Sequence, residues 1–188
     1  MKKNKYLLLF LLKFFGTYFL LFIFYNSYLN SNQITAPYFS CEPITQNVAM
    51  LTKRLGDFVG FPMRLLQSQN ELSVLVYTSK EYPVAAIVEG CNAISVIILF
   101  ISFIIAFSGR FLTTFLFILF GSVSIYFFNI FRIFILIVIP EYYPESQHFM
   151  HHYIFPTLIY GYTFLLWIWW IKKYAGFNLK KKKNEQKA

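Results

Sequence analysis

Hydrophobic residues fall into four long runs along the chain, and polar residues collect between and beyond these runs. The runs extend from about Tyr6 to Tyr25, Ala93 to Phe107, Phe111 to Ile139 and Tyr153 to Ile171. Because each run is continuously apolar rather than alternating, it predicts a membrane-spanning helix and not a strand of a β-barrel. The second run is short for a crossing of ~20 residues, so this helix either starts earlier, near Val84, or crosses where the bilayer thins.

The segment between the first two runs, residues 29–90, is the only sizeable polar part of the chain. From Thr45 to Leu66, apolar residues recur at helical spacing with charged residues between them, which predicts an amphipathic helix at the membrane interface. Pro43 suits the first position of such a helix. The helix would bend or end at the glycine and proline residues near its end: Gly56, Gly60 and Pro62. Two later runs, Leu72–Tyr77 and Tyr82–Val88, are typical of strands, and the short turn between them would make a hairpin.

These patterns predict one all-α integral membrane domain, with about four transmembrane helices in a bundle and a small extracytoplasmic insert. We divide it into an N-terminal anchor helix (1–28), the insert with its amphipathic helix and hairpin (29–90), the helices that carry the candidate chemistry (91–171) and a basic tail (172–188). The first run is longer than the ~7–15-residue core of a signal peptide and no small-residue cleavage site follows it, so we expect a retained anchor.

Composition and charge support a membrane location. Hydrophobic residues make up 57% of the 188 residues, and 24 residues are Phe, which a soluble domain of this size would not need. The net charge of +9 resembles a nucleic-acid signal, but the basic residues flank the apolar runs, so we expect no nucleic-acid partner. We expect the chain to lie in the cytoplasmic membrane of the cell. The positive-inside rule then places both termini in the cytoplasm and the insert on the extracytoplasmic side. The basic tail is interpreted as a stop-transfer anchor, with binding of anionic lipid as the alternative.

Cys91 stands at the outer mouth of the second run, directly after Glu89 and Gly90. A thiolate is the reactive form of cysteine, and the N-terminus of a helix would stabilise it. Gly90 lets the backbone turn and leaves room for a substrate chain. Two alternatives stay open: Cys91 is a buried structural cysteine, or it forms a disulfide with Cys41, the other cysteine of the chain.

Arg132 lies inside the third run, about two helical turns before its outer end. A charge at this depth costs several kcal/mol unless it is paired or hydrated, so an intramembrane arginine is a functional candidate by default. Asn129, three residues earlier, shares its helical face. The alternative is a structural pairing of Arg132 with a carboxylate such as Glu89 or Glu141.

Three histidines, His148, His151 and His152, lie at or just before the start of the fourth run, at spacings that allow a shared helical face. This spacing also suits zinc, but only Glu145 is near enough to contribute an acid, so we expect no metal. A histidine acting as general acid or base fits better, because its pKa suits proton transfer near neutrality. The alternative is that these are surface histidines at the membrane interface.

Topology brings the candidates together. With the N-terminus inside, the second run starts outside, the third ends outside and the fourth starts outside, so Cys91, Arg132 and His152 all belong to the outer half. A cysteine activated by a histidine, with an arginine stabilising an oxyanion or binding a carboxylate, makes an acyl-transfer site.

These residues resemble the exosortase/archaeosortase family of membrane transpeptidases. The resemblance rests on Glu89–Ile94, on Asn129–Ile133 and on a histidine that opens the last run. It covers about residues 85–171, and the short chain is most like the compact F-type exosortases. Two positions depart from the family pattern, because Ala93 and Pro156 stand where glycine is common. Many relatives also have more spans.

The resemblance implies that Cys91 is the nucleophile, Arg132 the charge stabiliser and His152 the acid or base, with His151 and His148 as alternatives and with Asn129 and Glu89 in supporting roles. It also implies no cofactor. The substrate would be an exported protein whose C-terminus combines a short motif, an apolar helix and a basic end, cleaved through a thioester on Cys91. The alternative function is a non-enzymatic assembly or transport subunit, in which Arg132 pairs with a carboxylate of another protein or with a phosphate.

Overall fold

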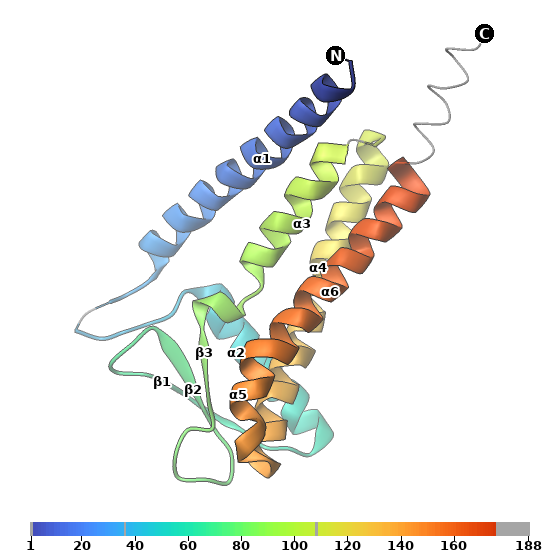
Figure 1. Cartoon of the computed structure of the whole chain (residues 1–188). Coiled ribbons are helices and arrows are strands. Elements are labelled where there is room, and N and C mark those ends of the chain that lie inside the picture. The colour runs from blue at the N-terminus through green and yellow to red at the C-terminus, as the bar shows by residue number, and fades with distance from the viewer. Residues whose placement is uncertain (1, 36, 108, 176–188) are drawn as a thin grey trace.

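The computed structural model describes residues 2–35, 37–107 and 109–175. Four helices run along its length: α1 (Lys2–Asn32), α3 (Ile94–Phe107), α4 (Phe111–Tyr142) and α6 (Phe155–Trp170). Figure 1 shows α3 between α1 and the pair α4 and α6, and α3 contacts all three of these helices. A small sheet lies at the opposite end of the molecule from the N-terminus, and we call this end the sheet end (Figure 1). The fold is thus a helical bundle with a small sheet at one end.

Two of the helices, α1 and α4, are long and apolar enough to cross a membrane. The α3 helix has 14 residues and α6 has 16. Each end of α6 is continued by π-helical turns, Met150–Ile154 and Ile171–Ala175. The expectation that the second span starts near Val84 is wrong, because residues 85–88 form a strand. The second apolar run, from about Ala93 to Phe107, therefore forms the short helix α3 alone.

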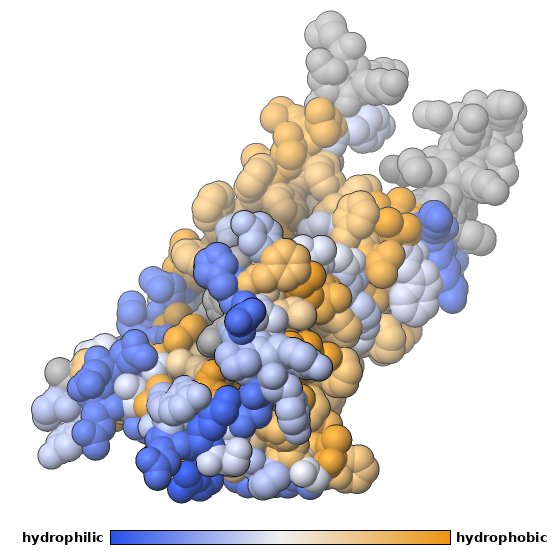
Figure 2. All heavy atoms as spheres, turned by 60° about the horizontal axis from the view of Figure 1, so that its bottom comes forward, coloured by the Kyte–Doolittle hydropathy of each residue, from blue (hydrophilic) through white to orange (hydrophobic). Residues whose placement is uncertain are grey.

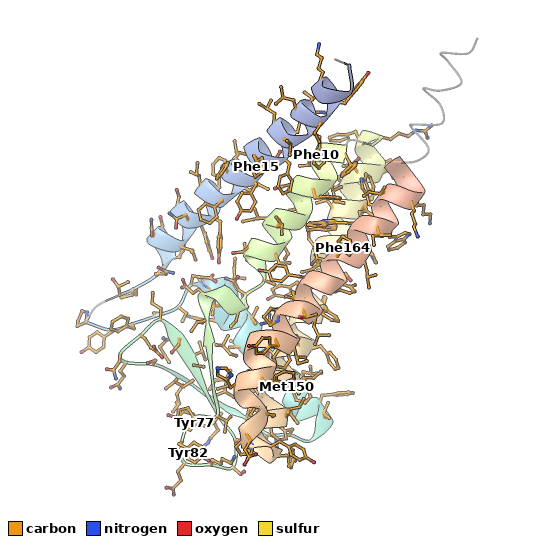
Figure 3. All side chains as sticks on the ribbon, viewed as in Figure 1. Phe10, Phe15, Tyr77, Tyr82, Met150 and Phe164 are labelled. Atoms are coloured by element: carbon orange, nitrogen blue, oxygen red, sulfur yellow. The ribbon has the colours of Figure 1, made fainter. Side chains whose placement is uncertain are left out.

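Side chains on the outside of the bundle are those of a membrane protein. Large apolar residues are exposed along the helices, for example Leu12 with 70% and Phe111 with 87% of its surface accessible. Figure 2 shows hydrophilic residues gathered over the sheet end and hydrophobic residues covering the helices beyond it. In the stick view of Figure 3, Phe10 and Phe15 lie on α1, and Tyr77 and Tyr82 lie at the sheet end. Because exposed apolar surface of this extent is unfavourable in water, lipid is its natural environment.

The amphipathic helix of the insert is α2 (Pro43–Val59), with Pro43 at its first turn as predicted. It ends well before Leu66. Gly60 follows in the left-handed conformation, with φ 81°, and its N–H bonds back to the carbonyls of Asp57 and Gly56. A glycine in this conformation closes a helix without steric cost. The predicted extension of the helix to Leu66 is therefore wrong, although the glycine and proline residues that end it were visible in the sequence.

The predicted hairpin is confirmed, and it belongs to a larger sheet. Strands β2 (Ser73–Tyr77) and β3 (Ala85–Val88) pair antiparallel, with Ser73 opposite Val88. A third strand that we did not predict, β1 (Arg64–Gln67), pairs antiparallel with the other side of β2, so the order is β1-β2-β3. Three of these residues, Arg64 to Leu66, lie in the segment that the sequence assigns to the helix, and Gln67 follows directly after it.

The insert packs against α4 and not on a core of its own. One face of the sheet and α2 bury a cluster of apolar residues together with α4, which includes Val48, Val76, Ile87, Ile133 and Ile137. The tip of the hairpin is tied to the same helix, since Thr78 donates a hydrogen bond to Glu141 at 2.8 Å and Lys80 forms an ion pair with it at 3.4 Å. This packing holds the end of β3, and the residues that follow it, beside α4.

Candidate active site

Cys91 closes a tight turn between the sheet and the bundle. The chain leaves β3, makes one 3-10 turn over Glu89–Cys91 and enters α3 at Ile94. The Cys91 side chain is half-buried, and both Cys91 and the buried Cys41 are free thiols. The alternative of a disulfide between them is therefore wrong. Burial raises the pKa of the Cys41 thiol, which keeps it protonated and unreactive.

Ala93, two residues after Cys91, has an unusual backbone conformation. Ala93 has φ 63°, and within the described part of the chain no other non-glycine residue has a positive φ. Its side chain is buried, at 5% exposure. The left-handed conformation costs roughly 1–2 kcal/mol for a residue with a Cβ. This is the position where the resemblance placed a glycine, and the geometry explains why a glycine suits it.

Asn129 connects the turn to Arg132. Its side chain is fully buried, at 0% exposure. The side-chain amide of Asn129 donates a hydrogen bond to the backbone carbonyl of Cys91 at 2.6 Å. Its oxygen accepts a hydrogen bond from Nη1 of Arg132 at 3.0 Å, across one turn of α4. The predicted pairing of Asn129 with Arg132 on one helical face is therefore confirmed, and one side chain links two of the candidate residues.

Arg132 is half-buried and pairs with no carboxylate. Neither ion pair found in the described part of the chain includes it. Glu141 is occupied by the hairpin tip, and Glu89 by groups near α1 and α2, so the alternative of a structural pairing with either acid is wrong. The Nε atom of Arg132 is buried without a hydrogen-bond partner. An arginine whose charge is only partly satisfied is a ready binding group for an anion.

The surroundings of Arg132 come from several elements. Its guanidinium carbon lies 5.8 Å from the centre of the Phe155 ring, at the first position of α6. It also interacts electrostatically with Cys91 and with Tyr160. The start of α6 and the turn that contains Cys91 therefore meet at Arg132.

The histidines precede α6. His148 lies in the short helix α5 (Gln147–Phe149) and is exposed. The backbone of His151 and His152 belongs to the π-helical turn Met150–Ile154, which leads directly into Phe155. The side chains of His151 and His152 lie outside the described part of the structure. Among the described residues, no group of three His, Cys, Asp or Glu side chains is arranged to hold a metal ion.

A buried carboxylate that the sequence did not suggest lies behind the turn. Glu42 is 0% exposed. It accepts hydrogen bonds from the backbone N–H and the hydroxyl of Thr45, at 2.8 and 2.6 Å, and so caps α2. It also accepts from the amide of Asn92 at 2.9 Å and from the Tyr28 hydroxyl at 3.5 Å. A buried carboxylate is tolerated when donors surround it in this way.

Asn92 completes this polar cluster on the other side. Its amide also donates to the hydroxyl of Tyr25 in α1 at 2.6 Å. Its oxygen accepts from the backbone N–H of Ile94 at 3.0 Å, which satisfies a free donor at the start of α3. Asn92, the residue that follows Cys91, therefore connects α1, α2 and α3. The only sequence signals were its place beside Cys91 and the position of Glu42 before Pro43.

Glu89 sits at the other end of the turn. Its carboxylate accepts hydrogen bonds from the side chain of Gln33 and from the backbone N–H of Glu42, the latter at 3.3 Å. Partial burial, together with the nearby negative charge of Glu42, raises the pKa of the Glu89 carboxyl, although the backbone hydrogen bond acts in the opposite direction. Residues on both sides of Cys91 are thus fixed by polar contacts.

Comparison with known proteins gives a family. The sequence profile of the transmembrane exosortases matches residues 6–169, which is most of the chain. The chain belongs to the transmembrane exosortase family. Comparison with curated proteins and with solved structures found no match for this exosortase. The suspected relationship to exosortases is therefore confirmed over a longer stretch than the motifs alone covered, and family membership supports a membrane transpeptidase or peptidase role in general.

Proposed function

We propose that this exosortase is a membrane-embedded cysteine transpeptidase that cleaves a C-terminal sorting signal of exported proteins. The observation that carries the proposal is the bridge made by Asn129, which bonds both the Cys91 carbonyl and the Arg132 guanidinium. It sets a thiol at the start of one helix beside a partly unsatisfied cation of the next. Family membership supplies the general class of reaction.

In the proposed reaction, the thiolate of Cys91 attacks the carbonyl carbon of the scissile peptide bond. A carbon–sulfur bond forms, and the negative charge that develops on the carbonyl oxygen is stabilised by Arg132. The carbon–nitrogen bond then breaks, and the leaving amine takes a proton from an imidazolium. The resulting thioester is attacked by an amine or by water, which gives its proton to the imidazole, and the carbon–sulfur bond breaks to release the Cys91 thiolate.

The imidazole in this scheme is assigned to His152, with His151 and His148 as the alternatives. The support is their place in the chain: the turn that contains His151 and His152 runs into Phe155, whose ring faces the Arg132 guanidinium. Glu89 and Asn129 would hold the nucleophile turn and not take part in proton transfer. No step of the scheme needs a metal or a cofactor.

The substrate would be an exported protein with a short motif, an apolar helix and a basic end at its C-terminus. Its helix would keep it in the same bilayer and bring the motif to the outer surface of the cytoplasmic membrane. Both termini of the exosortase would then lie in the cytoplasm, as the positive-inside rule predicts. Anchoring in one plane raises the effective concentration of motif and enzyme for each other.

The test is to coexpress the exosortase with an epitope-tagged exported protein that has such a C-terminus and to follow its size. Cys91→Ala should abolish shortening, and Cys41→Ala should leave it intact. Arg132→Gln should reduce shortening by roughly 100-fold or more, in line with the loss of an oxyanion-stabilising group. Arg54→Gln, which changes an exposed arginine of α2, is the matched control. Unchanged processing by Cys91→Ala would exclude this mechanism.

A further inference from the structure

The strand that leads to Cys91 is an edge strand. In the order β1-β2-β3, one side of β3 pairs with β2 and no strand of the described residues pairs with its other side. Figure 1 shows β3 running into α3, on the side of the sheet toward α5 and α6. Only the turn Glu89–Cys91 separates the end of β3 from the thiol.

The backbone groups on this free edge can be identified from the hydrogen-bond pattern. Ser68 donates its backbone N–H to the carbonyl of Ser73 at 2.9 Å, so the carbonyl of Ser73 points toward β1, while the N–H of Ser73 donates to the carbonyl of Glu71. Antiparallel pairing alternates along a strand, so the backbone groups of Leu75 point toward β1. The residues opposite these two in β3 are Val88 and Ala86. Their N–H and C=O groups therefore point away from β2, onto the free edge.

The same two residues are open to a ligand. Ala86 is exposed, and Val88 has 41% of its surface accessible, whereas Ile87 between them is buried. Natural proteins usually protect such an edge with a lysine, a proline or a bulge, because it can pair with another chain. The β3 sequence, Ala-Ala-Ile-Val, contains none of these, while the edge at β1 begins with Arg64. An unguarded edge beside a nucleophile is a natural place for an extended peptide.

We propose that the substrate segment before the cleavage site binds in extended form as an additional strand on the free edge of β3. This inference rests on the proposed function. Backbone hydrogen bonds to Ala86 and Val88 would hold the segment, and its direction would carry the scissile bond to Cys91. Strand addition of this kind gives affinity through the main chain and specificity through every second side chain.

The direction of the added strand follows from the membrane. The chain of the exosortase runs along β3, passes Cys91 and enters the bundle as α3. A substrate with an exported domain followed by an apolar helix must also run from the outer surface into the bilayer. The two chains therefore run the same way, and the added strand is parallel to β3.

Disulfide cross-linking tests both the pairing and its direction. The probe is an epitope-tagged exported protein with an apolar helix and a basic C-terminus that is shortened when the exosortase is present. Single cysteines are placed one by one along its motif. The exosortase carries Ala86→Cys or Val88→Cys, together with Cys41→Ala and Cys91→Ala, so that the substrate stays intact and no native thiol interferes.

Cross-links should form at every second substrate position. Moving the partner from Ala86→Cys to Val88→Cys should shift the best substrate position by two residues toward its C-terminus, as parallel strands require. The control is Leu66→Cys on the opposite edge strand, 57% exposed, which should give no cross-link. Cross-links without a two-residue period, a shift toward the N-terminus, or equal cross-linking from Leu66→Cys would each overturn the proposal.

The outcome is separable from that of the proposed function. If Cys91→Ala alone still shortens the probe, the thioester mechanism is wrong, while the cross-linking pattern still reports how the peptide docks. If Cys91→Ala blocks shortening but the alternating pattern is absent, the mechanism stands and strand addition is wrong.

Discussion

The amide of Asn129 bonds the carbonyl oxygen of Cys91 at 2.6 Å while its oxygen accepts from Arg132 at 3.0 Å. A fully buried side chain of α4 thus fixes the relative position of the turn that contains Cys91 and the guanidinium of Arg132. Rotation of the amide would exchange its donor and acceptor ends and break both contacts, so the pair of hydrogen bonds defines one orientation. The two groups to which we assign the reaction are therefore positioned by Asn129, which the proposed scheme leaves unreacted.

Replacement of Asn129 should impair processing without removing either reactive group. Asn129→Ala loses both hydrogen bonds, and Asn129→Asp keeps an acceptor for Arg132 but loses the donor to Cys91 and neutralises the cation. A buried polar group left without its partner costs about 1–3 kcal/mol, which corresponds to a rate roughly 5-fold to 150-fold slower. The rate of substrate shortening measures this effect. Asn70→Asp, on an exposed loop, is the control, and a wild-type rate for Asn129→Ala would contradict the positioning role.

The two cysteines should differ in their reaction with a membrane-impermeant maleimide. Cys91 is half-buried, whereas Cys41 is 1% exposed, and burial raises the pKa of its thiol, so that little thiolate is present near neutral pH. We expect labelling of the folded protein to disappear in Cys91→Ser and to persist in Cys41→Ala. Denaturation in detergent should make both cysteines reactive. Rapid labelling of folded Cys91→Ser protein would show that Cys41 is accessible and the packing around it incorrect.

Substitutions at Ala93 should reflect its φ of 63°. Ala93→Gly relieves about 1–2 kcal/mol of strain but loses a buried methyl group and about 0.5–1 kcal/mol through the entropy of glycine in the unfolded chain. The net stability should be unchanged or higher. Ala93→Val adds a β-branched residue in a conformation that it rarely adopts, so its melting temperature should fall by several degrees.

Thermal unfolding in detergent measures both Ala93 variants. The matched control is Ala106→Gly, in the last turn of α3, where the loss of a buried methyl group should destabilise by roughly 1 kcal/mol. If Ala93→Gly lowered stability as much as Ala106→Gly, the left-handed conformation of Ala93 would be wrong.

Glu89 should make stability depend on pH in a defined direction. Its pKa is raised in the folded protein by burial and by Glu42, so the folded state binds the proton more tightly than the unfolded state. Stability is then highest in acid and falls as pH rises from the ordinary glutamate pKa of about 4.3 through the raised value. The difference in melting temperature between wild type and Glu89→Gln should therefore change over this interval and level off above it. Parallel curves for the two proteins, with no such change, would mean that the carboxyl is not perturbed.

The sequence predicted the elements whose signals are local. Continuous apolar runs located the helices, two short runs typical of strands located the hairpin, and Pro43 marked the start of α2. It failed at residues 64–67, because Arg64–Gln67 is short and gains its strand character from pairing with β2, which is a contact distant in sequence. The segment assigned to the helix ran to Leu66, although Gly60, one of the residues that the sequence marked as a possible end, closes α2.

At the candidate site, residue types in the sequence identified candidate reactive groups but not the residues that hold them in place. A cysteine at a helix start and an arginine inside an apolar run are unusual enough to be noticed alone. Glu42 and Asn92 look ordinary in the sequence, and they gain meaning only because three-dimensional packing brings them together behind the turn. The pairing of Arg132 with an acid, a reasonable expectation from charge, was wrong because both candidate acids are engaged elsewhere.

The hydrogen bonds of Tyr25 and Tyr28 to Asn92 and Glu42 change the meaning of the first helix. Its phenol groups reach into the polar cluster around Asn92, the residue that follows Cys91. An unrelated hydrophobic helix in place of α1 would still insert into lipid. However, the amide of Asn92 would lose an acceptor, and the buried carboxylate of Glu42 would lose a donor. The α1 helix is therefore also part of the buried polar cluster around Glu42 and Asn92. Chimaeras that exchange this helix should retain both tyrosines.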